Sequence, residues 1–180
     1  CDVPRRGGEG EAVPDSESEA AERREAPGPK WSRNGEWKCP WQRGLQERPA
    51  DFFRTDFDDS EWRTIPVPSV WQTEKTGSVP YYYASTFPRA ISRSKHKIPC
   101  IDHDMQEIGH YRRTFTLPEN FEGKEIFLHF GAAKSALEVY VNGEFAGYSQ
   151  GSMTPHEFDV TAFLHSGENL VCARVYRYSD

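Results

Sequence analysis

The run Asp58-Asp59-Ser60-Glu61 brings carboxyl groups close together along the chain, and it is a first place where chemistry could occur. Paired carboxylates can perform general acid–base catalysis, in which one group donates a proton and another accepts one. The same residue types are typical of turns, because Asp and Ser side chains hydrogen-bond to backbone two residues further on. Trp62 follows directly, so we interpret the run as a capped turn that leads into a strand at Ile65.

A second group of candidate ligands lies between Arg89 and Glu107, where the alternation of the neighbouring segments is lost. Cys100 and His103 have half of the spacing of a structural zinc site, which normally needs a second such pair. The sequence contains no second pair, and we therefore interpret the stretch as a solvated loop. The candidate ligands in it are His96, Cys100, Asp102, His103 and Asp104.

Aromatic side chains are a third candidate, because the CH-rich face of a sugar packs on an aromatic ring. Rings of this size also bury large apolar areas, and they are common in protein cores. We interpret the aromatic series as core rather than as a platform for sugar. Its members are Trp37, Trp41, Phe52, Phe53, Phe57, Trp62 and Trp71.

The element that organises the chain is the run from Ser135 to Tyr148, which is centred on Asn142-Gly143. Asn-Gly between two alternating runs is the strongest short-range hairpin signal, because both turn residues must take a positive φ. Pairing outward from this turn predicts the cross-strand pairs Val141–Glu144, Tyr140–Phe145, Val139–Ala146 and Leu137–Tyr148.

In that register Leu137, Val139 and Ala146 share one face of the hairpin, and Tyr140 and Phe145 share the other. Both faces therefore carry apolar area. A hairpin of this kind is predicted to lie inside a layered β-structure rather than at its edge.

Further alternating runs flank the hairpin and predict strands at Tyr111 to Leu117, Glu125 to Phe130 and Asn169 to Ser179. In the last strand Val171, Ala173 and Val175 are expected to point inward, and Arg174 and Arg177 are expected to be less constrained. Asp159 to Gly167 predicts a short capped helical turn, and Pro66 and Pro68 mark an edge strand or extended loop. Short strands at regular spacing favour a sandwich or barrel.

Short motifs follow one another in a fixed order across residues 31–180. They read Asn34-Gly35-Glu36-Trp37, Gly109-His110-Tyr111-Arg112-Arg113-Thr114-Phe115, Gly147-Tyr148-Ser149-Gln150-Gly151-Ser152 and Tyr176-Arg177-Tyr178-Ser179-Asp180. Together they resemble the N-terminal sugar-binding domain of the bacterial-type β-galactosidases of glycoside hydrolase family 2. The resemblance implies an all-β fold, a jelly-roll β-sandwich, and a parent enzyme that hydrolyses terminal β-D-galactose residues with retention.

The resemblance also implies what this chain lacks and what it contributes. In the family both catalytic glutamates come from a separate barrel, so we expect no catalytic residue here and no activity of the chain alone. Asp180 is implied to contact the galactosyl ring and, as in relatives, to be a possible sodium ligand. A carboxylate suits this role because it accepts hydrogen bonds from two sugar hydroxyls at once. Relatives use Mg and Na ions, and no cofactor is expected within this chain.

Lys134 departs from the family pattern, since relatives commonly carry Asn or Asp directly before the Ser-Ala pair. An ammonium group donates three hydrogen bonds and accepts none, so it cannot replace an amide that does both. Three roles stay open for Lys134: contact with a sugar hydroxyl, pairing with Asp180, or exposure to solvent. The polar loop that contains Gln150, Ser152 and Thr154 is interpreted as a packed crossover that bonds its own backbone.

Composition limits the possible partners and compartment. A net charge of −6 argues against nucleic acid as the main partner. No apolar run is long enough to span a membrane and no signal peptide is recognisable, so a cytoplasmic protein is expected. The four cysteines follow no disulfide framework. A reducing compartment is therefore expected, with Cys172 buried in its strand.

Residues 1–30 contain no aromatic residue and are rich in Glu, Arg, Ala, Gly and Pro. Such a composition cannot offset its ordering entropy, and disorder is predicted. Residues 31–180 are predicted to be the sugar-binding domain, truncated at its C-terminal end. Expected partners are a β-galactoside and the remaining domains of a parent homo-oligomer. The alternatives are a stand-alone carbohydrate-binding module or a segment of a β-glucuronidase or β-mannosidase.

Overall fold

The computed structural model describes residues 30–44, 49–78 and 106–179. Within these residues the chain forms antiparallel strands and two one-turn 3-10 helices. The strands are β1 (Gly35–Lys38), β2 (Trp41–Arg43), β3 (Thr64–Val67), β4 (Glu107–Thr116), β5 (Phe127–Phe130), β6 (Ala136–Val141), β7 (Glu144–Gln150), β8 (His156–Asp159) and β9 (Glu168–Tyr176). The 3-10 helices are η2 (Glu119–Phe121) and η3 (Thr161–Phe163).

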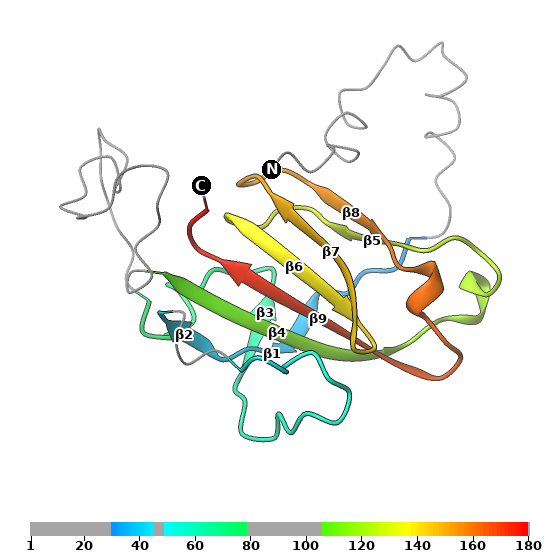
Figure 1. The fold of residues 1–180 in the computed structure, drawn as a ribbon, viewed down its shortest axis with the longest axis horizontal. Coiled ribbons are helices and arrows are strands. Elements are labelled where there is room, and N and C mark those ends of the chain that lie inside the picture. The colour runs from blue at the N-terminus through cyan, green and yellow to red at the C-terminus, as the bar shows by residue number, and fades with distance from the viewer. Residues whose placement is uncertain (1–29, 45–48, 79–105, 180) are drawn as a thin grey trace, which may run out of the picture.

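The strands form two sheets of unequal size (Figure 1). The larger sheet has the order β3-β1-β4-β9-β6-β7, with β2 paired to β4, and the smaller sheet consists of β5 and β8. The longest ladder joins β4 to β9, where Ile108 pairs with Tyr176 and Thr116 pairs with Glu168. The predicted all-β fold is confirmed. No helix in the described part of the chain is long and apolar enough to cross a membrane.

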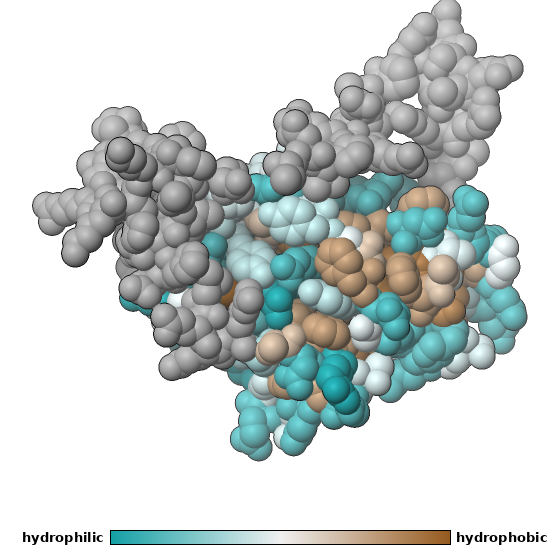
Figure 2. Space-filling view, in the orientation of Figure 1, coloured by the Kyte–Doolittle hydropathy of each residue, from teal (hydrophilic) through white to brown (hydrophobic). Residues whose placement is uncertain are grey.

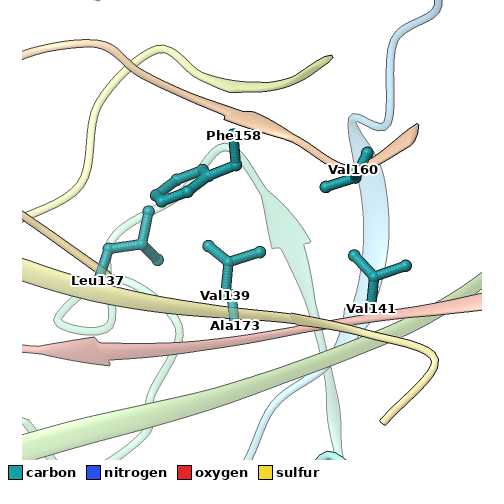
Figure 3. Packing of buried hydrophobic residues seen from close by; sticks show 6 residues of the cluster. All are labelled: Leu137, Val139, Val141, Phe158, Val160 and Ala173. Carbon is teal, nitrogen blue, oxygen red and sulfur yellow. The ribbon is translucent and has the colours of Figure 1, made fainter. Parts of the chain in front are cut away.

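The main core lies between the two sheets (Figure 3). Phe158 and Val160, which come from β8 and the residue after it, point toward side chains of β6. Burying a Val, Leu or Phe side chain stabilises a fold by about 1.5–3 kcal/mol, so this layer ties the small sheet to the large one. The residues that form it are Leu137, Val139, Val141, Phe158, Val160 and Ala173.

The hairpin forms at the predicted turn. Asn142 and Gly143 take positive φ values of 51° and 90°, and the predicted pairs next to the turn, Val141–Glu144 and Tyr140–Phe145, are confirmed. Beyond them the register shifts by one residue at a β-bulge.

The two outer predicted pairs of the hairpin are wrong as a result of this bulge. Val139 pairs with Gly147 instead of Ala146, and Leu137 pairs with Ser149 instead of Tyr148. The bulge brings a glycine opposite the core. A Cβ on Gly147 would lie 2.5 Å from Cδ1 of Phe158, so only a glycine lets β8 approach this closely.

The position of the hairpin also differs from the prediction. β7 is the last strand of the large sheet, so the hairpin lies at an edge and not inside the sheet. Both of its faces are nevertheless used. Ala146 packs against the main core, and on the opposite face Tyr140 stacks on Phe53, with ring centroids 4.4 Å apart. Apolar side chains gather on the surface over β6 and β7 (Figure 2), and Phe145 is 54% exposed.

The segment between β2 and β3 covers the face of the large sheet opposite the main core. Phe52 is fully buried there and packs against Leu170 and Cys172. The aromatic series is thus largely core, as predicted. Trp37, Phe52 and Trp71 are buried, and Trp41, Phe53, Phe57 and Trp62 are half-buried.

The acidic run at residues 58–61 is a turn, as predicted. Asp58 accepts a hydrogen bond from the backbone of Ser60 at 3.0 Å. Asp59 binds Lys38 at 2.6 Å and Arg112 at 2.8 Å. Partial burial would raise the pKa of Asp59, but these two cations outweigh it and lower the pKa. The carboxylates of Asp58 and Asp59 therefore stabilise the turn and its contacts with β1 and β4.

Several smaller predictions can be checked in the same way. β3, with Pro66, is an edge strand as predicted. Asp159 accepts a hydrogen bond from the backbone of Thr161 at the start of η3. Cys172 is buried, as predicted. Arg174 was expected to be less constrained, and this is wrong: it is buried and binds Glu138 at 2.9 Å. Residues 1–29 and the Cys-His stretch, 96–104, lie outside the described residues.

Candidate functional site

The site predicted around Lys134 lies where three segments meet at one end of the large sheet. Ser135, the next residue, donates its backbone N–H to the carbonyl of Tyr176 at the end of β9, at 2.5 Å. The loop after β7 binds the same segment from the other side. Gly151 donates to the Ser135 carbonyl at 3.1 Å, and Met153 donates to the Ala133 carbonyl at 3.2 Å.

The Lys134 segment is joined directly to the end of the described chain. The Ser135 hydroxyl donates to the hydroxyl of Ser179 at 2.9 Å. Ser179 directly precedes Asp180, the other predicted substrate-binding residue, which lies outside the described residues. Lys134 itself is exposed. The backbone segments that lead to the two predicted residues therefore lie side by side, and the pairing of Lys134 with Asp180 stays a prediction.

Gln106 holds the segment after β9 through its side chain. The Gln106 amide nitrogen donates to the carbonyl of Tyr178 at 2.8 Å, and its amide oxygen accepts from the N–H of Tyr178 at 2.9 Å. A side-chain amide can donate and accept at once, so it can bond both the N–H and the carbonyl of one residue, as the backbone of a neighbouring strand would. It fixes the backbone of the residues that lead to Asp180.

A buried ion pair supports the same segment. The Glu107 carboxylate binds Arg177 at 2.7 Å, and the two side chains are 3% and 12% exposed. Ser78 donates to the same carboxylate at 2.5 Å, and the Trp41 indole N–H donates at 3.3 Å. Because the carboxylate oxygen receives these hydrogen bonds, its charge is compensated despite its burial.

Sequence reasoning did not identify Gln106 or Glu107 as site residues. They lie at the end of the stretch in which alternation is lost. Their partners are distant in sequence, since Tyr178 follows Gln106 by 72 positions. No local pattern encodes such a contact. Arg177, like Arg174, was expected to be less constrained, and this is wrong: its side chain is 12% exposed and forms an ion pair with Glu107.

A cluster around Glu138 lies next to Tyr176. The Glu138 carboxylate accepts hydrogen bonds from Arg174 at 2.9 Å, from the Tyr176 hydroxyl at 2.9 Å and from the Tyr140 hydroxyl at 3.2 Å. Burial raises the pKa of the Tyr176 phenol, and the neighbouring carboxylate raises it further. Tyr176 therefore stays protonated and remains a donor, which holds the end of β9 near the Ser135 segment.

Other polar residues of the described chain also have structural partners. Thr154 donates to the Gly151 carbonyl at 3.0 Å, so the polar loop bonds its own backbone as predicted. His129 on β5 pairs with Glu157 on β8 at 3.1 Å, and both side chains are 49% exposed. The pair that His129 and Glu157 form does not involve the Lys134 segment.

No metal cluster is present in the described part of the chain, where no group of three or more His, Cys, Asp or Glu could hold an ion. The predicted sodium ligand is Asp180. Because it lies outside the described residues, its fit to sodium stays a prediction.

Comparison with known protein families identifies the family to which this fold belongs. Residues 31–180 match the family described as glycosyl hydrolases family 2, sugar binding domain. The chain belongs to glycoside hydrolase family 2. The predicted family resemblance is thereby confirmed, and the meeting point of residues 133–135, 151–153 and 176–179 lies within a family 2 sugar-binding domain.

Among curated relatives, the chain is 36% identical over 149 residues to a β-galactosidase of Priestia megaterium. It is 37% identical over 157 residues to a β-galactosidase of Vibrio cholerae. These alignments cover 83% and 85% of this chain, but only 14% of each relative. A β-galactosidase large subunit of Leuconostoc lactis is 33% identical, with 82% of this chain and 25% of the relative covered. The chain thus spans a small part of these relatives.

Among solved structures, a Bacteroides uniformis β-glucuronidase matches with a TM-score of 0.59 and 26% identity over 83% of this chain and 15% of that one. A Bifidobacterium dentium β-glucuronidase, complexed with coumarin-3-O-glucuronide, matches with a TM-score of 0.57 and 23% identity. It covers 82% of this chain and 21% of that one, and at this identity it supports the fold alone.

Proposed function

We propose that this chain is the sugar-binding N-terminal segment of a β-galactosidase that hydrolyses terminal non-reducing β-D-galactose residues, as in lactose, with retention. The observation that supports this most is the sequence similarity to β-galactosidases, 36% and 37% over more than four-fifths of the chain. The joining of the Lys134 segment to Ser179, next to Asp180, supports a shared sugar-binding edge.

In this proposal Asp180 accepts hydrogen bonds from galactosyl hydroxyls, and Lys134 donates to the sugar from the rim of the site. Hydrogen bonds to a charged group contribute about 1.5–3 kcal/mol each. A sodium ion on Asp180 would supply a positive charge that screens the carboxylate. The chain's own part is to hold the two backbone segments together through Ser135, Gln106 and Glu107.

The proposal assigns catalysis to parts of the enzyme outside this chain. Retaining hydrolysis needs two carboxyl groups about 5–5.5 Å apart. The carboxylates of Asp59, Glu107 and Glu138 are occupied by Arg112, Arg177 and Arg174. The family resemblance implies that both catalytic glutamates lie outside this chain, so the purified chain is expected not to cleave a chromogenic β-galactoside. Measurable turnover would overturn this part of the proposal.

The test of the sugar site is a titration of the 180-residue chain with galactose, followed by NMR. We expect changes at Ala133–Ser135 and at Ser179, with millimolar or weaker affinity, about −4 kcal/mol. Asp180→Asn should weaken the affinity further, and Asp56→Asn, an exposed acid paired with Arg54, should leave it unchanged. Changes confined to other segments would contradict the site, and micromolar affinity would mean that the site is complete without further domains.

A β-glucuronidase segment is the second candidate, and two observations favour it. The solved structures that match include β-glucuronidases at 26% identity, and Lys134 supplies an exposed cation that can pair with a uronate carboxylate. Parallel titrations with galactose and glucuronate separate the two. Preference for glucuronate that disappears in Lys134→Gln would support this candidate, and preference for galactose would support the first.

A further inference from the structure

His156, the first residue of β8, makes hydrogen bonds with both of its ring nitrogens. Its Nδ1 lies 2.5 Å from the hydroxyl of Ser149 on β7. Its Nε2 lies 3.2 Å from the Thr154 hydroxyl and 3.4 Å from the Gly151 carbonyl. The imidazole thus connects the edge strand of the large sheet, the small sheet and the loop between them.

The partners determine the tautomer of this imidazole. The Gly151 carbonyl can only accept, and the Thr154 hydroxyl already donates to that carbonyl at 3.0 Å. Nε2 must therefore carry the hydrogen, which it shares between Thr154 and Gly151. Nδ1 faces the hydroxyl of Ser149, a residue that is 4% exposed. One imidazole therefore satisfies a buried hydroxyl and closes the loop.

The loop that His156 closes has little space to rearrange. Gly151 has a φ of 136°, a backbone conformation that residues other than glycine rarely adopt. A Cβ there would lie 2.7 Å from the Thr154 hydroxyl and 3.6 Å from the His156 ring. The loop is therefore packed directly on the imidazole.

The same loop holds the Lys134 segment. Gly151 and Met153 donate their backbone N–H groups to the carbonyls of Ser135 and Ala133, at 3.1 and 3.2 Å. These two carbonyls belong to the residues on either side of Lys134. A loop fixed by His156 therefore fixes the backbone from which the Lys134 side chain extends.

We propose that His156 is a positioning residue of the sugar-binding edge: its hydrogen bonds to Ser149, Thr154 and Gly151 hold residues 151–153 against residues 133–135 and so set the position of Lys134. The proposal rests on the proposed function, since it gives His156 a role in sugar binding through Lys134. It also makes a claim about the backbone that does not depend on sugar.

The backbone claim is tested by hydrogen exchange of the Gly151 and Met153 amides in the 180-residue chain. His156→Phe keeps a ring but removes its hydrogen bonds, and both amides should exchange about tenfold faster. His156→Gln places an amide nitrogen near the position of Nε2 and should restore most of the protection. His129→Phe is the matched control, because His129 lies on the partner strand β5 and pairs with Glu157 instead. Unchanged exchange in His156→Phe would overturn the proposal.

The sugar-binding role is tested by titrating galactose into the same variants, with the NMR signals of Lys134 and Ser135 as the readout. His156→Phe should weaken binding about fivefold, and His156→Gln should restore it. Faster exchange together with unchanged galactose affinity would overturn the positioning role. A parent chain that binds no galactose, yet loses amide protection in His156→Phe, would contradict the proposed function while supporting the backbone claim. The two failures are therefore distinguishable.

Discussion

Arg112 on β4 binds Asp59 in the turn before β3 at 2.8 Å, although 53 residues separate the two in sequence. The Arg112 side chain is 4% exposed. Its guanidinium also donates to the carbonyls of Phe52 and Arg54. The buried guanidinium of Arg112 thus binds the segment between β2 and β3 to the face of the large sheet that it covers.

Removing the carboxylate should destabilise the chain strongly. Asp59→Ala leaves the Arg112 guanidinium buried without its anion, and breaking a buried pair typically costs about 3–5 kcal/mol. Because Asp59 is 22% exposed, we expect the lower end of this range. Urea unfolding followed by tryptophan fluorescence measures it. Asp56→Ala is the control, since the Arg54–Asp56 pair is exposed and worth under about 1 kcal/mol.

The same contact predicts a pH dependence of stability. The pKa of Asp59 is lower in the folded chain than its ordinary value, so the unfolded chain takes up the proton more readily. The stability that Asp59 contributes is therefore complete above its unfolded pKa, about 3.9, and it is lost as the pH falls through the folded value. Urea midpoints measured from pH 6 to pH 2.5 should fall less in Asp59→Asn than in the parent chain. Parallel curves would contradict the prediction.

Glu107 is expected to matter both for stability and for the candidate site. Glu107→Gln removes the charge that faces Arg177, and a buried arginine without its partner should cost about 3 kcal/mol. The amide of Arg177, which donates to the Glu107 carbonyl at 2.9 Å, and the amide of Tyr178 should also exchange faster.

Arg43 provides the control for Glu107. It lies 3.9 Å from the same carboxylate but is 52% exposed, so Arg43→Gln should change the stability by under about 1 kcal/mol. If Glu107→Gln and Arg43→Gln have equal effects, the burial of the Glu107–Arg177 pair does not determine its contribution.

Local signals were sufficient to predict the hairpin turn and the strands. Asn142-Gly143 is recognisable from the sequence, because Asn and Gly adopt a positive φ more readily than other residues. The fold adds distant hydrogen bonds to this turn, such as the one that Asn142 donates to Asn169 at 2.8 Å. Likewise Asp159 caps η3 through a bond to Thr161, two residues away. Features that depend on neighbours in the sequence can be predicted from the sequence.

Features that depend on distant partners could not be predicted in this way. The bulge opposite Val139 accompanies the close approach of Phe158 to Gly147, and Phe158 belongs to another sheet. Arg174 looked unconstrained because its partner Glu138 lies on β6, 36 residues earlier. The hydrogen bond from the Gln106 side chain to Tyr178 joins residues that are 72 positions apart. Motif order located the Lys134 segment, but only the fold identifies which side chains hold it.

The close contact between β7 and β8 gives a last prediction, at Gly147. Gly147→Ala would place a Cβ 2.5 Å from the Phe158 ring, and such overpacking typically costs about 1–3 kcal/mol. Gly131→Ala is the matched control, because its Cβ would find only the His129 ring at 3.9 Å. Its effect should be small.

The cause of that loss can be isolated with a double-mutant cycle. Phe158→Leu alone should destabilise the chain, because it leaves space in the main core. Combined with Gly147→Ala, the smaller side chain relieves the clash, so the double variant should lose less stability than the sum of the two single losses, by about 1 kcal/mol. Urea unfolding of the four chains measures this coupling. Strictly additive losses would mean that the ring of Phe158 is not what requires a glycine at position 147.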